Sequence, residues 1–201
     1  NALVSAVATT SARILDTRKT LPGYRILDKY AVRMGGGTNH RMSLYDMIMV
    51  KDNHIDGSGG ITRAIQQARA HYPDLPIEGE VRNFDELREA LACDPPLDRI
   101  LVDNMTPDQM REAVVIAAGR VPIEASGNIT LERAAEIAAT GVDYLSAGSL
   151  THSVKALDLS MKISPKPDNG LSEKIRRIRQ IKAELGDRMV ILGHHYQRDE
   201  I

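Results

Sequence analysis

The stretch RILVDNMTPDQMREAVVIAAGRVPIEASGN (99–128) decides the fold class of this chain. It opens with an apolar run that stops at Asp and Asn, and a second such run, IEASGN (123–128), closes it. The residues between them predict a helix, because Thr106 can cap the first turn and Gly119 follows the last one. A strand, a helix and another strand in this order predict two parallel strands joined by a right-handed crossover.

The same alternation continues on both sides of this unit. Short apolar runs that stop at charged, amide or glycine residues are ILDTRK (14–19), MIMVKDNH (47–54), IEGEV (77–81) and YLSAGSLTH (144–152). Helical stretches separate most of them. Adding LDLSMKI (157–163) gives about seven strands, so we expect an α/β fold with a TIM-like parallel (β/α) barrel rather than a short open sheet.

Composition excludes several classes of protein. The chain has 201 residues and a net charge of −1, so bulk charge favours neither nucleic acid nor a membrane surface as a partner. Its one cysteine, Cys93, cannot build a disulfide framework or a cysteine metal site, and a cytoplasmic compartment is expected. No apolar run approaches the roughly 18 residues of a membrane span.

Three segments are predicted along the chain. Residues 1–163 hold the barrel, and SPKPDNG (164–170) is a linker marked by proline, asparagine and glycine. Residues 171–201 hold a basic amphipathic helix and one orphan strand, which cannot bury a core alone and so indicate the start of a truncated second domain. Because the sequence opens on Asn1 within a helical pattern, we also expect a longer parent protein.

Cationic side chains follow the early strands. Arg18 and Lys19 come directly after the first strand, and the loop RMGGGTNHR (33–41) brings His40 and Arg41 after three glycines. In a parallel barrel all strand C-termini open onto one face, so these side chains should converge. Arginine clamps carboxylate or phosphate with two hydrogen bonds and lysine acts as a point charge, so we expect a site for a polyanion. A flexible loop, the alternative for residues 33–41, explains the glycines but not the polar residues.

Three further residues end strands. Lys51 could be a Schiff-base nucleophile or a phosphate anchor, and the pattern leaves both open. Glu80 and Asp103 end successive strands, where carboxylates can hold Mg²⁺ or stabilise a developing carbocation. Ion pairing with neighbouring cations is the alternative, and both can hold at once.

Two glycine-bearing turns follow the late strands, EASGN (124–128) and SAGSLTH (146–152). Backbone amides of late strand–helix loops in barrels often cradle a phosphate, and His152 can add a contact. The pair of turns therefore indicates a phosphate site.

Taken together, DTRKT, GGGTNHR, VKDNH, EGEV, LVDN, EASGNIT and GVDYLSAGSLTHS closely resemble the catalytic barrel of quinolinate phosphoribosyltransferase, over residues 1–163. That family is also called nicotinate-nucleotide pyrophosphorylase (carboxylating). The resemblance implies transfer of phosphoribosyl from phosphoribosyl pyrophosphate to quinolinate in NAD biosynthesis. Decarboxylation accompanies the transfer, giving nicotinate mononucleotide, pyrophosphate and CO₂, with Mg²⁺ as cofactor.

The resemblance also implies roles for particular residues. Arg18, His40 and Arg41 would bind the quinolinate carboxylates, with Lys19 between substrate and phosphate. The catalytic residues would be Lys51, which contacts the phosphoribosyl donor, and Glu80 and Asp103, which face the ribose hydroxyls and Mg²⁺. The 5′-phosphate would be held by Ser126, Gly127, Gly148 and His152.

Family members are homodimers in which an N-terminal domain of one subunit completes the site of the other. That domain is not expected within this sequence, so the resemblance does not imply activity for this chain alone. The tail over 187–201 is similar to the start of quinolinate synthase, with His194 and Tyr196 as substrate contacts, but without cluster cysteines. A fusion protein and a chimeric reading frame both remain open.

Two other functions compete with this interpretation. One is a lyase barrel that uses Lys51 as a Schiff base, although such chemistry needs neither the two arginines nor the GGGTNHR loop. The other is a non-catalytic fragment.

Overall fold

The computed structural model describes residues 2–162 and 170–188. The chain divides into two compact units, Asn1–Ala156 and Leu157–Ile201. The first unit contains the sheet and every strand-end residue selected above, so it carries the functional argument.

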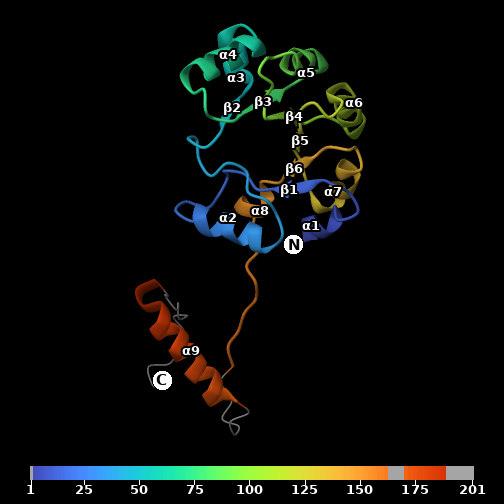
Figure 1. Cartoon of the computed structure of the whole chain (residues 1–201). Helices are drawn as coiled ribbons and strands as arrows, with labels where there is room; N and C mark the ends of the chain where they lie inside the picture. Colours follow the sequence, from blue (N-terminus) through green and yellow to red (C-terminus); the bar gives the residue numbers. More distant parts are fainter. Residues whose placement is uncertain (1, 163–169, 189–201) are drawn as a thin grey trace. The chain divides into compact units, whose positions relative to one another are not determined.

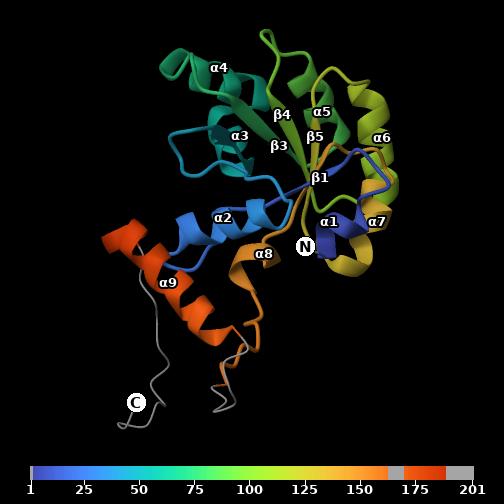
Figure 2. The same cartoon turned by 60° about the horizontal axis from the view of Figure 1, so that its bottom comes forward.

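The first unit is a parallel sheet with helices on its outer side (Figures 1 and 2). Its strands are β1 (Arg13–Leu15), β2 (Ile48–Val50), β3 (Ile77–Val81), β4 (Arg99–Asp103), β5 (Ile123–Ser126) and β6 (Tyr144–Ser146). All described pairs are parallel, in the order β1-β6-β5-β4-β3-β2. The helices are α1 (Ala2–Ala6), α2 (Arg25–Met34), α3 (Asp52–Ser58), α4 (Ile61–His71), α5 (Phe84–Leu91), α6 (Pro107–Ala117), α7 (Leu131–Ala138) and α8 (Ser149–His152).

Capping and apolar periodicity place the outer helices. The Asn83 side chain accepts hydrogen bonds from two backbone amides at the start of α5, and Thr106 forms a capping box with Gln109 at the start of α6. Leu87 and Met110 then turn inward from these helices and are buried. Burying their apolar faces against the sheet is the main stabilising term of this layer.

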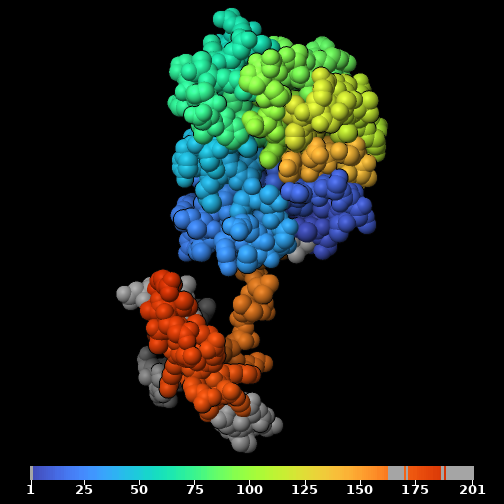
Figure 3. Space-filling view, in the orientation of Figure 1, coloured from blue at the N-terminus to red at the C-terminus, as the bar shows by residue number. Residues whose placement is uncertain are grey.

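Residues from the two ends of this unit lie side by side. β1 pairs with β6, and in the space-filling view the dark-blue N-terminal segment packs directly against the yellow-orange segment that contains α7 (Figure 3). This pairing fixes the strand end at Asp16 next to the turn after β6.

The sheet is curled and open between its two edge strands, β1 and β2. Thr38 forms an isolated parallel bridge with Leu15 and so takes the free edge of β1. The α/β class and the parallel sheet are confirmed, with six strands in the described residues.

The prediction of a seventh strand at 157–163 is wrong for residues 157–162, the part of it that the structure describes. Residues 157–162 have no regular secondary structure, and Leu157, Leu159 and Met161 are each about four-fifths exposed (79%, 81% and 82%). Their alternation is typical of a strand with one buried face, but a strand also needs a free edge to pair with. At β1 that edge is already used by Thr38.

The second unit contains helix α9 (Leu171–Leu185) and a short 3-10 turn, η1 (Gly186–Arg188). This confirms the helix expected after the linker. The linker itself falls almost entirely outside the described residues, as do the orphan strand, His194 and Tyr196. Among the helices of the described ranges, none combines the length and apolar character that crossing a membrane requires.

Candidate active site

A cleft of about 710 Å³ opens at the carboxyl ends of the strands. Every strand-end residue selected from the sequence lines it: Arg18, Lys19, His40, Arg41, Lys51, Glu80, Asp103, Ser126, Gly127, Gly148 and His152. The parallel sheet therefore brings together residues that lie more than a hundred positions apart in the chain. Their individual roles remain predictions.

One end of the cleft is cationic. The Arg41 guanidinium donates a 2.8 Å hydrogen bond from Nη1 to the Met47 carbonyl, which ties it to the residues before β2. Burial and the positive charge of nearby Arg18 lower the pKa of Arg41. Two guanidinium groups that repel each other across a cleft create a site that favours an anion between them.

The carboxylates of the cleft lie on neighbouring strands. Glu80, at the end of β3, forms an ion pair with Lys51, which precedes α3. Asp103 ends β4, and its carboxylate accepts a 2.7 Å hydrogen bond from the side-chain amide of Asn104. The ion-pair alternative considered for Glu80 is therefore present, and it holds Lys51 at the cleft wall.

Glycines allow close backbone approach in the turns after β5 and β6. Gly127 has φ +94°, and a Cβ there would lie 2.2 Å from the Asn104 side-chain oxygen. Gly148 lies beneath the His152 ring, where a Cβ would meet ring atoms at 3.0 Å. The turn after β5 therefore needs glycine, and the turn after β6 leaves little room for a side chain beneath His152.

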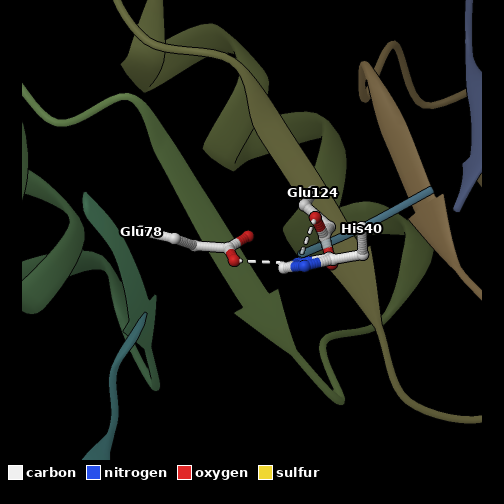
Figure 4. A group of neighbouring side chains, drawn as sticks. All are labelled: His40, Glu78 and Glu124. Atoms are coloured by element: carbon white, nitrogen blue, oxygen red, sulfur yellow. Dashed lines mark ion pairs between the residues drawn. The ribbon is translucent and has the colours of Figure 1, made fainter. Parts of the chain in front are cut away.

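Beneath the cleft, a buried polar cluster joins His40 to two glutamates (Figure 4). His40 Nε2 lies 2.9 Å from Glu78 Oε2 on β3 and 3.5 Å from Glu124 Oε2 on β5. Arg99 of β4 completes the cluster, with Nη1 2.7 Å from Glu124 and its guanidinium 4.3 Å from the centre of the Tyr144 ring.

Charge within this cluster is balanced. Burial alone would lower the pKa of His40, but hydrogen bonds and charge from Glu124 and Glu78 outweigh burial and raise it to about 9. Burial likewise opposes ionisation of Glu124, but His40 and Arg99 lower its pKa to about 2. Burial and the charge of Glu124 raise the pKa of Glu78.

One contact opposes the positively charged form of the His40 ring. The Arg41 amide lies 2.7 Å from Nδ1, which suits a neutral ring with its proton on Nε2. Two carboxylates within 3.5 Å outweigh one backbone dipole, so we assign the imidazolium form at neutral pH.

His40, Glu78 and Glu124 also form the one group in the described ranges whose ligand atoms lie close enough together for a metal ion. The Arg99 guanidinium already supplies a positive charge to both glutamates, with Nη1 2.7 Å from Glu124 and 3.9 Å from Glu78. Two carboxylates balanced by Arg99 and imidazolium leave little charge for a metal, so we interpret the group as an ion-pair cluster.

We expect stability to fall at alkaline pH because of this cluster. The pKa of His40 in the folded chain, about 9, exceeds its ordinary 6.5, so its contribution is complete below pH 6.5 and is lost as pH rises through 9. The free energy of unfolding, measured by urea titration, should drop by a few kcal/mol across this window. His40→Gln should flatten the drop, and an equal drop in the variant would contradict the assignment.

Glu78 and Glu124 were missed from the sequence. Strand periodicity could have found them, because Glu78 shares a face of β3 with Glu80, and Glu124 shares a face of β5 with Ser126. Both residues lie two positions before the strand-end residues on the same face, so a rule based on strand ends alone does not reach them.

Together, fold and cleft define a parallel α/β domain with a cleft of cationic, acidic and glycine residues at the strand ends. Residues 1–162 match the family described as quinolinate phosphoribosyl transferase, C-terminal domain. The chain belongs to this family.

Its relatives include a nicotinate-nucleotide pyrophosphorylase (carboxylating) of Mycobacterium leprae, 49% identical over 81% of this chain and 57% of that protein. A mitochondrial quinolinate phosphoribosyltransferase (decarboxylating) of Nicotiana tabacum is 46% identical over 79% of this chain and 50% of that protein. The crystal structure of NadC from Streptococcus pyogenes superposes with a TM-score of 0.77 at 46% identity, covering 81% of this chain and 56% of that one. The chain thus spans about half the length of the curated relatives it matches.

Proposed function

We propose that this domain binds quinolinate and phosphoribosyl pyrophosphate and joins them, with release of pyrophosphate and CO₂, to form nicotinate mononucleotide. The observation that carries the proposal is the set of groups that line the cleft. Arg18, His40 and Arg41 line it together with the glycine turns that follow β5 and β6. A pyridine dicarboxylate fits the cationic side chains, and a sugar phosphate fits the glycine turns.

At the cationic end, two guanidinium groups and an imidazolium would hold the two carboxylates of quinolinate. Lys19 lies beside them and would contact the phosphate of the donor. This arrangement would orient the ring nitrogen toward the ribose. The free energy of substrate binding would then offset much of the entropy cost of bringing the two substrates together before the chemical step.

At the ribose, the ring nitrogen would attack C1′ while the bond from C1′ to pyrophosphate breaks. Positive charge develops on the ribose, and the carboxylates of Glu80 and Asp103 would stabilise it. Lys51 is held at this place by Glu80 and would stabilise the leaving pyrophosphate. CO₂ then leaves from ring carbon 2, the electron pair of the broken bond stays on that carbon, where the adjacent positive nitrogen stabilises it, and a proton then binds there.

Mg²⁺ is part of the proposal. Glu80 and Asp103 are oxygen donors at the cleft, but with only two carboxylates they fit an ion shared with substrate phosphates and water rather than a closed protein site. When bound, Mg²⁺ would supply positive charge to the leaving pyrophosphate.

The experiment is product analysis with the full chain. Quinolinate, phosphoribosyl pyrophosphate and Mg²⁺ should yield nicotinate mononucleotide and CO₂ in equal amounts. Because the chain spans only about half the length of these relatives, titration of each substrate is measured in parallel. A folded chain that binds neither substrate would contradict the proposal.

Gly127→Ala tests the phosphate end. The new Cβ would clash with Asn104, and the residue would be held at φ +94°, so we expect a loss of stability of about 1–3 kcal/mol. Affinity for inorganic phosphate should fall about tenfold, since one charge-assisted hydrogen bond is worth roughly 1.5–3 kcal/mol. Gly119→Ala is the matched control, because Gly119 has φ +70° but open space around it. Equal phosphate affinity in the two variants would refute the assignment.

Two finer parts of the proposal concern the cell and the assembly. We propose a cytoplasmic homodimer for the complete protein, as the family resemblance implies. The lyase alternative gains no support, because Lys51 is paired with Glu80 and the chain's family is one of phosphoribosyl transferases.

A further inference from the structure

Helix α2 turns a lysine inward and apolar side chains outward. Lys29 is fully buried, whereas Ile26, Tyr30 and Met34 of the same helix are 75%, 58% and 63% exposed. A buried lysine is costly unless its charge is paired, so Lys29 needs a specific role in the fold.

Lys29 reaches the strand end of β1 and the loop that follows α2. Its ammonium lies 2.5 Å from Asp16 Oδ1 and donates a 3.0 Å hydrogen bond to the His40 carbonyl. The same Asp16 oxygen accepts a 2.8 Å hydrogen bond from the His40 amide. Both backbone groups of His40 are therefore held by one buried ion pair.

Asn39 extends this arrangement. Its side-chain amide donates to Asp16 Oδ2 at 2.5 Å and to the Lys29 carbonyl at 2.8 Å. Thr38, one residue earlier, is bridged to β1 through its amide, 2.8 Å from the Ile14 carbonyl. The backbone of 38–40 is thus fixed along the edge of β1, directly before Arg41.

We propose that Asp16 and Lys29 are positioning residues that set the affinity of the cleft for a pyridine dicarboxylate by fixing the backbone of His40 and Arg41. The proposal rests on the function proposed above and adds two residues that do not line the cleft. His40 and Arg41 point to different partners, Glu78 and the Met47 carbonyl, so a shift of their shared backbone would displace both cations.

The turn after β5 supplies an internal reference. Gly127 of this turn lies against Asn104, which follows β4, whereas Lys29 contacts Asp16 and His40. Loss of the ion pair should therefore separate the two affinities, whereas general loss of structure would lower both.

The experiment compares Lys29→Met with the unaltered chain by calorimetric titration of quinolinate and, separately, of inorganic phosphate. Quinolinate affinity should fall on the order of tenfold to a hundredfold, because small displacements of binding groups have effects of that size. Phosphate affinity should change less than about twofold. Met110→Ala, in the core beneath α6, is the control that lowers the melting temperature without separating the affinities.

A second variant and a second readout keep the test decisive. Asn39→Ala removes two hydrogen bonds without stranding a charge, so it replaces Lys29→Met if that variant does not fold. Amide hydrogen exchange at His40 needs no ligand, and it should accelerate at least about tenfold in either variant.

The outcomes separate two kinds of failure. Unchanged quinolinate affinity in a folded variant, or a parallel fall of both affinities, would overturn the positioning role. If the unaltered chain binds no quinolinate, the proposed function fails. In that case unchanged exchange at His40 would overturn the fixing of its backbone, and faster exchange would support it.

Discussion

Arg41→Ala should weaken quinolinate binding roughly 30-fold or more. Removing one partner from a desolvated, hydrogen-bonded charge pair costs about 2–5 kcal/mol, and each 1.4 kcal/mol is a factor of about ten. Arg41 is held toward the cleft by the Met47 carbonyl and repelled by Arg18, so its guanidinium is already placed for an anion. Calorimetric titration of quinolinate into the full chain measures the loss.

Two further variants define what is lost at Arg41. Arg41→Lys keeps the charge but not the two-pronged geometry, so it should recover only part of the affinity. Arg82→Ala is the matched control, because Arg82 pairs with Asp56 and Glu86 outside the cleft. If Arg41→Ala bound quinolinate as tightly as Arg82→Ala, the carboxylate clamp would be wrong.

Glu124→Ala should destabilise the fold by about 3–5 kcal/mol, since removing one partner leaves buried charges without compensation. Arg99 would lose its 2.7 Å contact and keep Glu78 only at 3.9 Å, and His40 would keep only one of its two carboxylates, Glu78 at 2.9 Å. For a chain of this size the melting temperature should drop by roughly 6–20 °C. Thermal unfolding followed by circular dichroism gives the value.

Two control variants separate the effect of the Glu124 charge from the effect of its side-chain volume. Glu124→Gln keeps the side-chain volume and an acceptor, so its loss should be smaller than that of the alanine variant. Glu112→Ala, on the exposed face of α6, should change the melting temperature little. A Glu124→Ala variant as stable as Glu112→Ala would show that the buried cluster does not support the fold.

The strand-end residues could be predicted because a parallel sheet imposes one simple rule. Every strand enters the cleft from the same side, so the last polar residue of each apolar run faces a shared space. Arg18, Lys51, Glu80 and Asp103 all follow this rule, and each lines the cleft.

The ion pair of Lys29 with Asp16 could not be predicted in the same way. Lys29 lies in a helix whose exposed apolar residues suggest the opposite orientation, so periodicity alone places the lysine in solvent. Its burial follows from Asp16 and the His40 backbone, which are contacts between three separate segments. Pairings of this kind depend on tertiary structure, and no local pattern encodes them.

The seventh strand shows a different limit. The alternation in 157–163 describes which side chains could face a core, but pairing depends on whether a sheet edge is free. The edge of β1 is occupied by Thr38 through a single bridge. The segment around Thr38, TNHR, has none of the apolar alternation of a strand, so the sequence does not predict this pairing.

Calorimetric titration of quinolinate and of nicotinate into the folded chain, with and without phosphoribosyl pyrophosphate and Mg²⁺, tests the central claim most directly. Nicotinate lacks the second carboxylate, so a cleft with two guanidinium groups and an imidazolium should bind quinolinate at least about tenfold more tightly. That preference should disappear in Arg41→Ala. Equal affinity for the two acids, or no binding of quinolinate by the folded chain, would contradict the claim that this cleft recognises a pyridine dicarboxylate.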